Sequence, residues 1–359
     1  MAAADTAREA ATDAVKRIRE SMAHKLVGKR DLVDGILTAA MAGGHILLEG
    51  VPGLAKTLAV RLFAHATGLS YRRIQFTPDL LPGDITGTLF YDAASGRFVP
   101  REGPVFANIV LGDEINRAPA KVQSALLEAM EERQVTMGDR SLPLPNPFMV
   151  LATQNPVEHE GTFRLPEAQL DRFMLKLLVD YPASGEELQV VLGSALGSGH
   201  GSGHGSGHGS ANGAANGAAN GARLAGAEAA KEASLAAVAD FSALKGALDQ
   251  VRFQDAVAAY AVAVVRATRP QSSKDQVPAL RDLARYVEFG ASPRGSIALY
   301  QAAKAAAFLD GRDHVLPEDV KRQAPAVLRH RIVVSYEAEA ERVSADAIIQ
   351  GILAAVPLP

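Results

Sequence analysis

The sequence predicts a three-layer α/β domain with a parallel five-stranded sheet, followed by a small all-α domain. Five short apolar segments have the length and composition of strands, and helical patterns lie between most of them. This alternation is typical of a parallel sheet that is covered by helices. Alanine-rich helical patterns occupy the C-terminal third of the chain, and a low-complexity stretch separates them from the strands.

The N-terminal part begins with two helical patterns, at 5–24 and 29–42. Each predicted strand is an apolar run that turn residues bound, and two additional hairpins are indicated between strands, at 89–100 and 133–144. The five strands of the sheet are predicted at 45–49, 72–76, 108–112, 148–153 and 174–179.

The C-terminal part follows a change of composition. Residues 193–226 repeat GSGH and then ANGA, a composition that cannot bury enough apolar surface to become ordered. We therefore expect a core domain at 1–192, a flexible linker at 193–226 and a helical domain at 227–359. Helices of this last domain are predicted at 227–248, 253–267, 278–288, 293–309 and 317–329.

The segment between the first strand and the next helix is rich in glycine and reads GVPGLAKT. A glycine-rich turn in this position lets consecutive backbone N–H groups point at one phosphate chain, and the helix N-terminus adds its positive dipole end. Lys56 would reach the β- and γ-phosphates, and the Thr57 hydroxyl would ligate Mg²⁺. The sequence therefore predicts a nucleoside triphosphate site formed by Gly50, Val51, Pro52, Gly53, Leu54, Ala55, Lys56 and Thr57.

One position departs from the general pattern G-x4-G-K-S/T, in which a glycine precedes the lysine. Here that residue is Ala55. Because the turn closes into a helix at this point, we expect Ala55 to adopt the right-handed helical conformation that alanine prefers.

Two adjacent carboxylates, Asp113 and Glu114, follow the third predicted strand. Parallel strands deliver such residues to the sheet edge where ligands of α/β folds collect. Asp113 suits the Mg²⁺ shell, and Glu114 can orient the attacking water and take its proton, although phosphoryl transfer rests mainly on positioning and charge neutralisation. Two carboxylates after a strand can also be a simple helix cap, but their pairing with the glycine-rich loop favours nucleotide hydrolysis.

With these residues in place, the chain resembles the MoxR-type AAA+ ATPases, which are P-loop NTPases. The likeness runs in order through GVPGLAKT, LGDEINRAP, ATQNPVEHEGTF, LPEAQLDRF and GASPR. It implies binding of ATP with Mg²⁺ between the subunits of a ring, expected to be a homohexamer. It also implies chaperone-like remodelling or maturation of a client protein, including metal insertion, often with a von Willebrand factor A domain partner.

The resemblance also implies roles for three residues beyond the phosphate loop. Asn155 would be the polar sensor that holds the attacking water, and Arg172 an arginine finger that reaches a neighbouring subunit. Arg294 would be the sensor arginine of a lid that closes over the nucleotide. From the residues alone, Asn155 can be a turn former before Pro156, and Arg172 a surface ion-pair partner of Glu167.

Arg294 has independent support from helix physics. Ser292 and Pro293 have the character of an N-cap and a first helical residue, so Arg294 would lie in the first turn, where the helix dipole disfavours a cation. A cation in an unfavourable position suggests an anionic ligand. The resemblance further implies that Arg117 lies at the subunit interface, that Val27 and Gly28 lie against adenine, and that the two hairpins face the ring pore.

Composition narrows the class of protein. A net charge of −3 and a pI near 6.3 give no support to a nucleic-acid surface, and the RHR segment at 329–331 is expected to be a solvated helix face. Cysteine is absent, which excludes disulfides and thiol nucleophiles. The longest apolar run, 257–265, is far shorter than the ~20 residues that cross a bilayer. We therefore expect a cytoplasmic protein without membrane insertion.

Two alternatives use the same residues. In one, the chain is the ATPase subunit of a tetrapyrrole metal chelatase, which has the same active-site parts. In the other, it is a nucleotide-gated binding scaffold with little hydrolysis. The presence of Glu114, Asn155 and Arg172 argues against the scaffold, whereas Ala55 leaves room for it.

Overall fold

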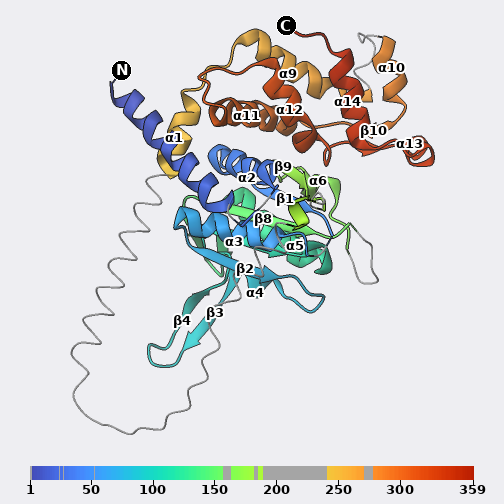
Figure 1. The fold of residues 1–359 in the computed structure, drawn as a ribbon. Coiled ribbons are helices and arrows are strands. Elements are labelled where there is room, and N and C mark those ends of the chain that lie inside the picture. The colour runs from blue at the N-terminus through green and yellow to red at the C-terminus, as the bar shows by residue number, and fades with distance from the viewer. Residues whose placement is uncertain are drawn as a thin grey trace.

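The structure is a computed structural model, which describes residues 2–23, 25–26, 28–51, 53–156, 163–181, 185–188, 241–270 and 278–359. It contains a sheet domain and a helical domain that lie against each other (Figure 1). The predicted linker at 193–226 lies outside the described residues, as do residues 227–240 of the first predicted helix after it.

The central sheet is parallel and has five strands in the order β2-β5-β8-β1-β9. All five predicted strands are confirmed, each within one or two residues of the expected ends. The strands are β1 (Ile46–Glu49), β2 (Tyr71–Gln75), β5 (Ile109–Asp113), β8 (Met149–Gln154) and β9 (Leu175–Leu178).

Helices cover both faces of this sheet. On one face, α1 (Ala2–Ala23) packs on α2 (Arg30–Ala42) and α3 (Lys56–Thr67), and on the other lies α5 (Ala120–Glu132). Alternate residues of β1 serve the two faces, since Ile46 and Leu48 join the core under α1–α3 whereas Leu47 joins the core under α5. The predicted three-layer arrangement is therefore confirmed.

Both predicted hairpins are present. The first pairs β3 (Gly87–Asp92) with β4 (Arg97–Glu102), follows the short helix α4 (Pro82–Thr86), and projects from the sheet on the side away from the helical domain (Figure 1). The second pairs β6 (Gln134–Met137) with β7 (Arg140–Pro143). Large apolar side chains on the first hairpin are exposed to solvent: Leu89, Phe90, Tyr91, Phe98 and Val99.

The helical domain is more elaborate than the sequence predicts. The expected helices near 253–267, 293–309 and 317–329 are confirmed as α9 (Asp255–Ala267), α11 (Pro293–Leu309) and α12 (Pro317–Leu328). The helix predicted at 278–288 ends early, as α10 (Pro278–Ala284). Elements that the sequence did not predict complete the domain: β10 (Val287–Phe289), β11 (Val333–Val334), α13 (Tyr336–Glu341) and α14 (Ala345–Ala355).

The helical domain docks on the core through the segment after α12. Arg331 pairs with Asp171 at 2.8 Å and donates to the carbonyls of Phe173 and Met174, and His330 bonds to the Phe173 carbonyl. Both side chains are buried. The prediction of a solvated face at 329–331 is therefore wrong, because the backbone entering β9 offers carbonyl acceptors for the Arg331 guanidinium and the His330 imidazole inside the seam.

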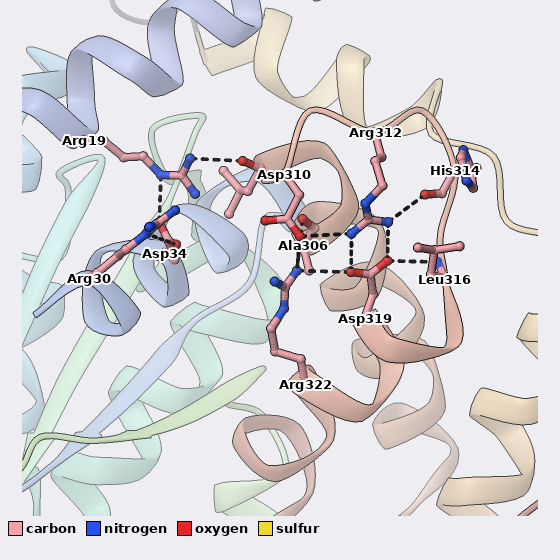
Figure 2. A network of polar contacts seen from close by, with 11 residues as sticks. Arg19, Arg30, Asp34, Ala306, Asp310, Arg312, His314, Leu316, Asp319 and Arg322 are labelled. Carbon is pink, nitrogen blue, oxygen red and sulfur yellow. Dashed lines mark hydrogen bonds and ion pairs between the residues drawn. The ribbon is translucent and has the colours of Figure 1, made fainter. Parts of the chain in front are cut away.

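A second polar seam joins the two domains near the N-terminus (Figure 2). Arg19 on α1 pairs with Asp34 on α2 at 2.8 Å and donates at 3.0 Å to the Leu309 carbonyl at the end of α11. Next to it, Arg312 binds both carboxylate oxygens of the buried Asp319.

None of the described helices is long and apolar enough to cross a membrane.

Candidate functional site

The glycine-rich loop follows β1 and leads into α3, as predicted. Gly53 has a φ of 86°, a conformation that favours glycine. Gly50 is required for a different reason, since a Cβ there would lie 2.4 Å from the Val179 carbonyl oxygen. The loop therefore needs glycine at both positions, and Pro52 between them lies outside the described residues.

Ala55 does not adopt the predicted right-handed conformation. It has φ 58° and ψ 12°, in the left-handed region, immediately before the first residue of α3. The loop has to reverse its twist to direct backbone N–H groups inward before the helix begins, so the position favours glycine. The expectation for Ala55 was wrong because it treated this residue as part of the helix, whereas it is the residue before it.

Lys56 and Thr57 open α3 beside this loop. The Lys56 ammonium donates to the carbonyls of Gly50 and, at 2.8 Å, Val51. Burial lowers the pKa of Lys56, and the negative charges of Asp113 and Glu114 oppose this change. The cation thus lies over the loop and within the field of Asp113, the predicted Mg²⁺ ligand, and of Glu114, the predicted catalytic carboxylate.

Asp113 ends β5 and lies at the centre of a small polar network. Its Oδ1 accepts a 2.6 Å hydrogen bond from the Thr153 hydroxyl, and its Oδ2 accepts one of the same length from Arg73. The Thr57 hydroxyl lies 3.4 Å from Oδ2. The structure therefore brings together Thr57 and Asp113, the two residues that the sequence predicts as Mg²⁺ ligands.

Glu114 follows Asp113 in the left-handed conformation, with a φ of 58°. Its backbone N–H donates to the Thr153 hydroxyl, and its carboxylate accepts from Gln75 at 3.1 Å. Arg117 pairs with the same carboxylate at 3.0 Å. The left-handed backbone turns the chain out of the strand direction at Glu114, and Gln75 and Arg117 hold the Glu114 carboxylate at the carboxyl end of the sheet.

Asn155 comes directly after β8, which lies between β5 and β1 in the sheet. This order places Asn155 between the carboxylates and the phosphate loop. Its backbone carbonyl accepts from the Asn116 side chain at 3.4 Å. The role that the resemblance implies for Asn155, holding a water near the terminal phosphate, stays a prediction.

Sequence reasoning missed three residues of this network, namely Arg73, Gln75 and Thr153. Gln75 is the last residue of β2 and pairs in register with Asp113 of β5. Polar residues at the carboxyl ends of neighbouring parallel strands meet at one edge. That rule would have identified Gln75 and Thr153, but the reach of Arg73 depends on its rotamer and leaves no sequence signal.

Gly28 borders a cavity of about 700 Å³ between α1, α2 and the segment at 185–188. Lys29 beside it donates to the Asp180 carbonyl at 2.6 Å, and Val179, which precedes Asp180, contacts Gly50. The cavity therefore lies close to the phosphate loop, where the sequence predicts the adenine. Val27, the other predicted adenine contact, lies outside the described residues.

Arg172 and Arg294 lie at the amino ends of the parallel strands, whereas the phosphate loop lies at their carboxyl ends. Met174 bonds to the carbonyl of His45, which precedes β1, whereas the loop follows the end of β1. The four residues of β1, roughly 13 Å long, therefore separate the two regions. The expectation that Arg294 closes over the nucleotide of its own chain does not fit this arrangement.

Glu131, near the end of α5, pairs with both arginines. One carboxylate oxygen lies 2.8 Å from Arg172, and the other accepts a hydrogen bond from Arg294. The alternative pairing of Arg172 with Glu167 is wrong. Arg294 lies in the first turn of α11 behind the Ser292 cap, as predicted, and Glu131 supplies the counter-charge that the sequence analysis assigned to an anionic ligand.

The residues present fit Mg²⁺ and a nucleoside triphosphate. Thr57 and Asp113 supply the hard oxygen donors that Mg²⁺ prefers, and they lie beside Lys56 and a helix N-terminus. The open space at the Gly53 Cβ position leaves room for a phosphate chain. Among the described residues, no group of three or more His, Asp or Glu side chains could hold a further metal ion, and the three histidines of the predicted linker lie outside them.

Comparisons with known proteins agree with this geometry. Residues 45–175 match the ATPase family associated with various cellular activities (AAA), and residues 281–352 match the AAA lid domain. The chain is 42% identical to Chaperone MoxR1 of Mycobacterium tuberculosis over 334 residues, which cover 93% of this chain and 79% of that protein. It is 30% identical to Protein MoxR of Methylorubrum extorquens, covering 97% of this chain and 96% of that protein.

A solved structure is similar over almost the whole chain. It belongs to a candidate ATPase from Cytophaga hutchinsonii, with a TM-score of 0.82 and 40% identity, covering 99% of this chain and 98% of that one.

Proposed function

Because this chain belongs to the MoxR-type AAA+ ATPases and hydrolyses ATP, we propose that it does so as a cytoplasmic ring of identical subunits that remodels or matures client proteins. The observation that supports the ring is the position of Arg172 and Arg294. Both lie beyond the amino end of β1, at the edge away from the phosphate loop of their own chain. They can meet a γ-phosphate only if a second copy presents one.

Within one subunit, the residues around the loop have separable roles. Backbone N–H groups of the loop and the Lys56 ammonium would bind the phosphates, while Thr57 and Asp113 would hold Mg²⁺. Mg²⁺, when bound, neutralises phosphate charge in the transition state. Glu114 and Asn155 would orient the attacking water, with Gln75 and Arg117 fixing the Glu114 carboxylate.

The hairpin β3–β4 is the surface proposed to contact the client. Its aromatic side chains are solvent-exposed, 58% for Phe90 and 64% for Phe98, although large apolar groups usually lie inside a protein. An exposed apolar patch on a projecting hairpin suits the transient capture of an unfolded segment. Metal insertion and a partner with a von Willebrand factor A domain belong to the same proposal.

The test is steady-state ATP hydrolysis with Mg²⁺ as protein concentration is raised, run beside Glu114→Gln and Arg172→Ala. We expect activity per subunit to increase with concentration, and both substitutions to abolish it while ATP binding persists. An arginine supplied by a neighbour can contribute ~10³ to 10⁵ in rate. Activity that does not depend on concentration and survives Arg172→Ala would refute the shared site.

A further inference from the structure

We propose that Glu131 is a positioning residue, which holds Arg172 and Arg294 together as one anion-binding pair for the nucleotide of the neighbouring subunit. This inference rests on the proposed ring, in which those arginines act on a second copy. Each oxygen of the Glu131 carboxylate binds a different arginine, one from the core domain and one from the helical domain. The carboxylate therefore sets the spacing of two guanidinium groups that would otherwise repel each other.

The location of Glu131 supports a functional role. It lies in the last turn of α5, where the helix dipole disfavours a carboxylate. Arg172 compensates for this position, because it also donates at 2.6 Å to the Leu127 carbonyl of the same helix. The C-terminal end of α5, in the core domain, therefore holds both Arg172 and the Glu131 carboxylate in place.

The second arginine arrives on a separately fixed element. The Asp171 carboxylate accepts a 2.8 Å hydrogen bond from the hydroxyl of Ser292, the residue that caps α11. The same carboxylate forms a 2.8 Å ion pair with the buried Arg331. These contacts attach the start of α11 to the residue before Arg172. Arg294, two residues after Ser292, is then directed at Glu131.

The pair remains accessible to a ligand. Side-chain exposure is 31% for Arg172, 52% for Arg294 and 35% for Glu131. All three border a cavity of about 280 Å³ at the junction of the two domains. A terminal phosphate carries more oxygens and more charge than a carboxylate, and guanidinium groups bind such oxygens readily, so it can replace Glu131 between the two arginines.

Glu131→Gln keeps the size of the side chain and removes its charge. We expect kcat per subunit to fall about 3- to 10-fold, a loss that corresponds to two half-exposed ion pairs, with the affinity of the same subunit for ATP unchanged. Glu132→Gln is the matched control, because Glu132 is the next residue, is exposed and has no ion pair among the described residues. It should hydrolyse ATP like the unmodified protein.

Rings assembled from two variants distinguish a positioning role of Glu131 for the neighbouring subunit from a structural role within its own subunit. Glu114→Gln subunits are expected to hold ATP without hydrolysing it and to retain the arginine pair, whereas Glu131→Gln subunits keep their own hydrolytic residues but have a displaced arginine pair. An excess of Glu114→Gln should therefore restore activity at the sites of Glu131→Gln subunits. Arg172→Ala mixed in the same way tests the shared site itself, and far-ultraviolet circular dichroism of each variant tests its fold.

The outcomes are distinct. Rescue of both Arg172→Ala and Glu131→Gln supports the proposal. Rescue of Arg172→Ala alone, or a Glu131→Gln variant that is as active as Glu132→Gln, overturns the role of Glu131 and leaves the ring intact. Rescue of neither variant refutes the shared site, and the positioning role fails with it.

Discussion

Ala55 has a left-handed backbone conformation, which glycine adopts without strain but alanine does not. At a φ of 58° this conformation is unfavourable for alanine by roughly 1–2 kcal/mol. Ala55→Gly should therefore raise the free energy of unfolding by about 0.5–1 kcal/mol, after allowing for the greater freedom of glycine in the unfolded chain. Urea denaturation measures this change. Ala66→Gly inside α3 is the control, and it should lower the free energy of unfolding by about 1 kcal/mol. If Ala55→Gly lowered the free energy of unfolding by the same amount, the left-handed conformation of Ala55 would be contradicted.

His45, the residue before β1, makes the stability of the fold depend on pH. Its Nδ1 accepts from the Val150 N–H at 3.0 Å, so Nε2–H donates to the Met130 carbonyl and the ring is neutral. Burial, followed by the charge of Arg133, lowers its pKa from 6.5 to about 4. The unfolded chain therefore binds the proton first as pH falls, and stability that is complete above pH 6.5 is lost between pH 6.5 and 4.

The lowered pKa of His45 determines how much stability the protein loses as pH falls. Between pH 7.5 and 5, the contribution of His45 to the free energy of unfolding should fall by about 2 kcal/mol. His45→Gln keeps a donor and an acceptor but does not titrate. Urea denaturation of both proteins at the two pH values should show a steeper loss for the unmodified protein, and parallel losses would contradict a neutral, buried His45.

At the scale of elements, the turn between α11 and α12 depends on one buried carboxylate (Figure 2). Asp319 is 2% exposed, binds Arg312 through both oxygens and caps the N–H of Leu316 at 2.9 Å. Asp319→Asn leaves Asp310 as the remaining carboxylate partner of Arg312 and Arg322, and it should destabilise the helical domain by about 2 kcal/mol. The exposed neighbour Glu318 provides the control, since Glu318→Gln should change the unfolding free energy by less than about 0.5 kcal/mol in urea. Equal effects would show that the network does not stabilise the turn.

At the scale of the whole molecule, the predicted phosphate-binding residues that the structure describes lie at one end of the strands, whereas Arg172 and Arg294 lie at the other. Assembly should therefore depend on bound ATP. Glu114→Gln, in which we expect ATP to bind without being hydrolysed, should sediment with ATP and Mg²⁺ at about six times the 37.7 kDa mass of one chain. Lys56→Ala, which we expect to lose phosphate binding, should sediment as smaller species under the same conditions. If ATP leaves the mass of Glu114→Gln unchanged, nucleotide does not join the subunits.

The sequence by itself determined the order of the strands along the chain, the phosphate loop, the paired carboxylates and the two hairpins. These features are local, because apolar runs, turn residues and capping patterns are read over a few neighbouring residues. The Ser292 cap of α11 was predictable for the same reason. The additional helices α13 and α14 were not predicted, and the weak strands β10 and β11 exist only because they pair with each other.

The tertiary structure alone decided how distant residues meet. It placed Arg73 on Asp113, Gln75 on Glu114, and Glu131 between Arg172 and Arg294. It also buried Arg331 where the sequence predicted a solvated face. Such contacts join residues that lie 39 to 163 positions apart, and they follow from sheet order and domain docking, which no local pattern encodes. Charged side chains in particular find partners wherever the packed backbone leaves acceptors, so their pairing can be known only from the fold.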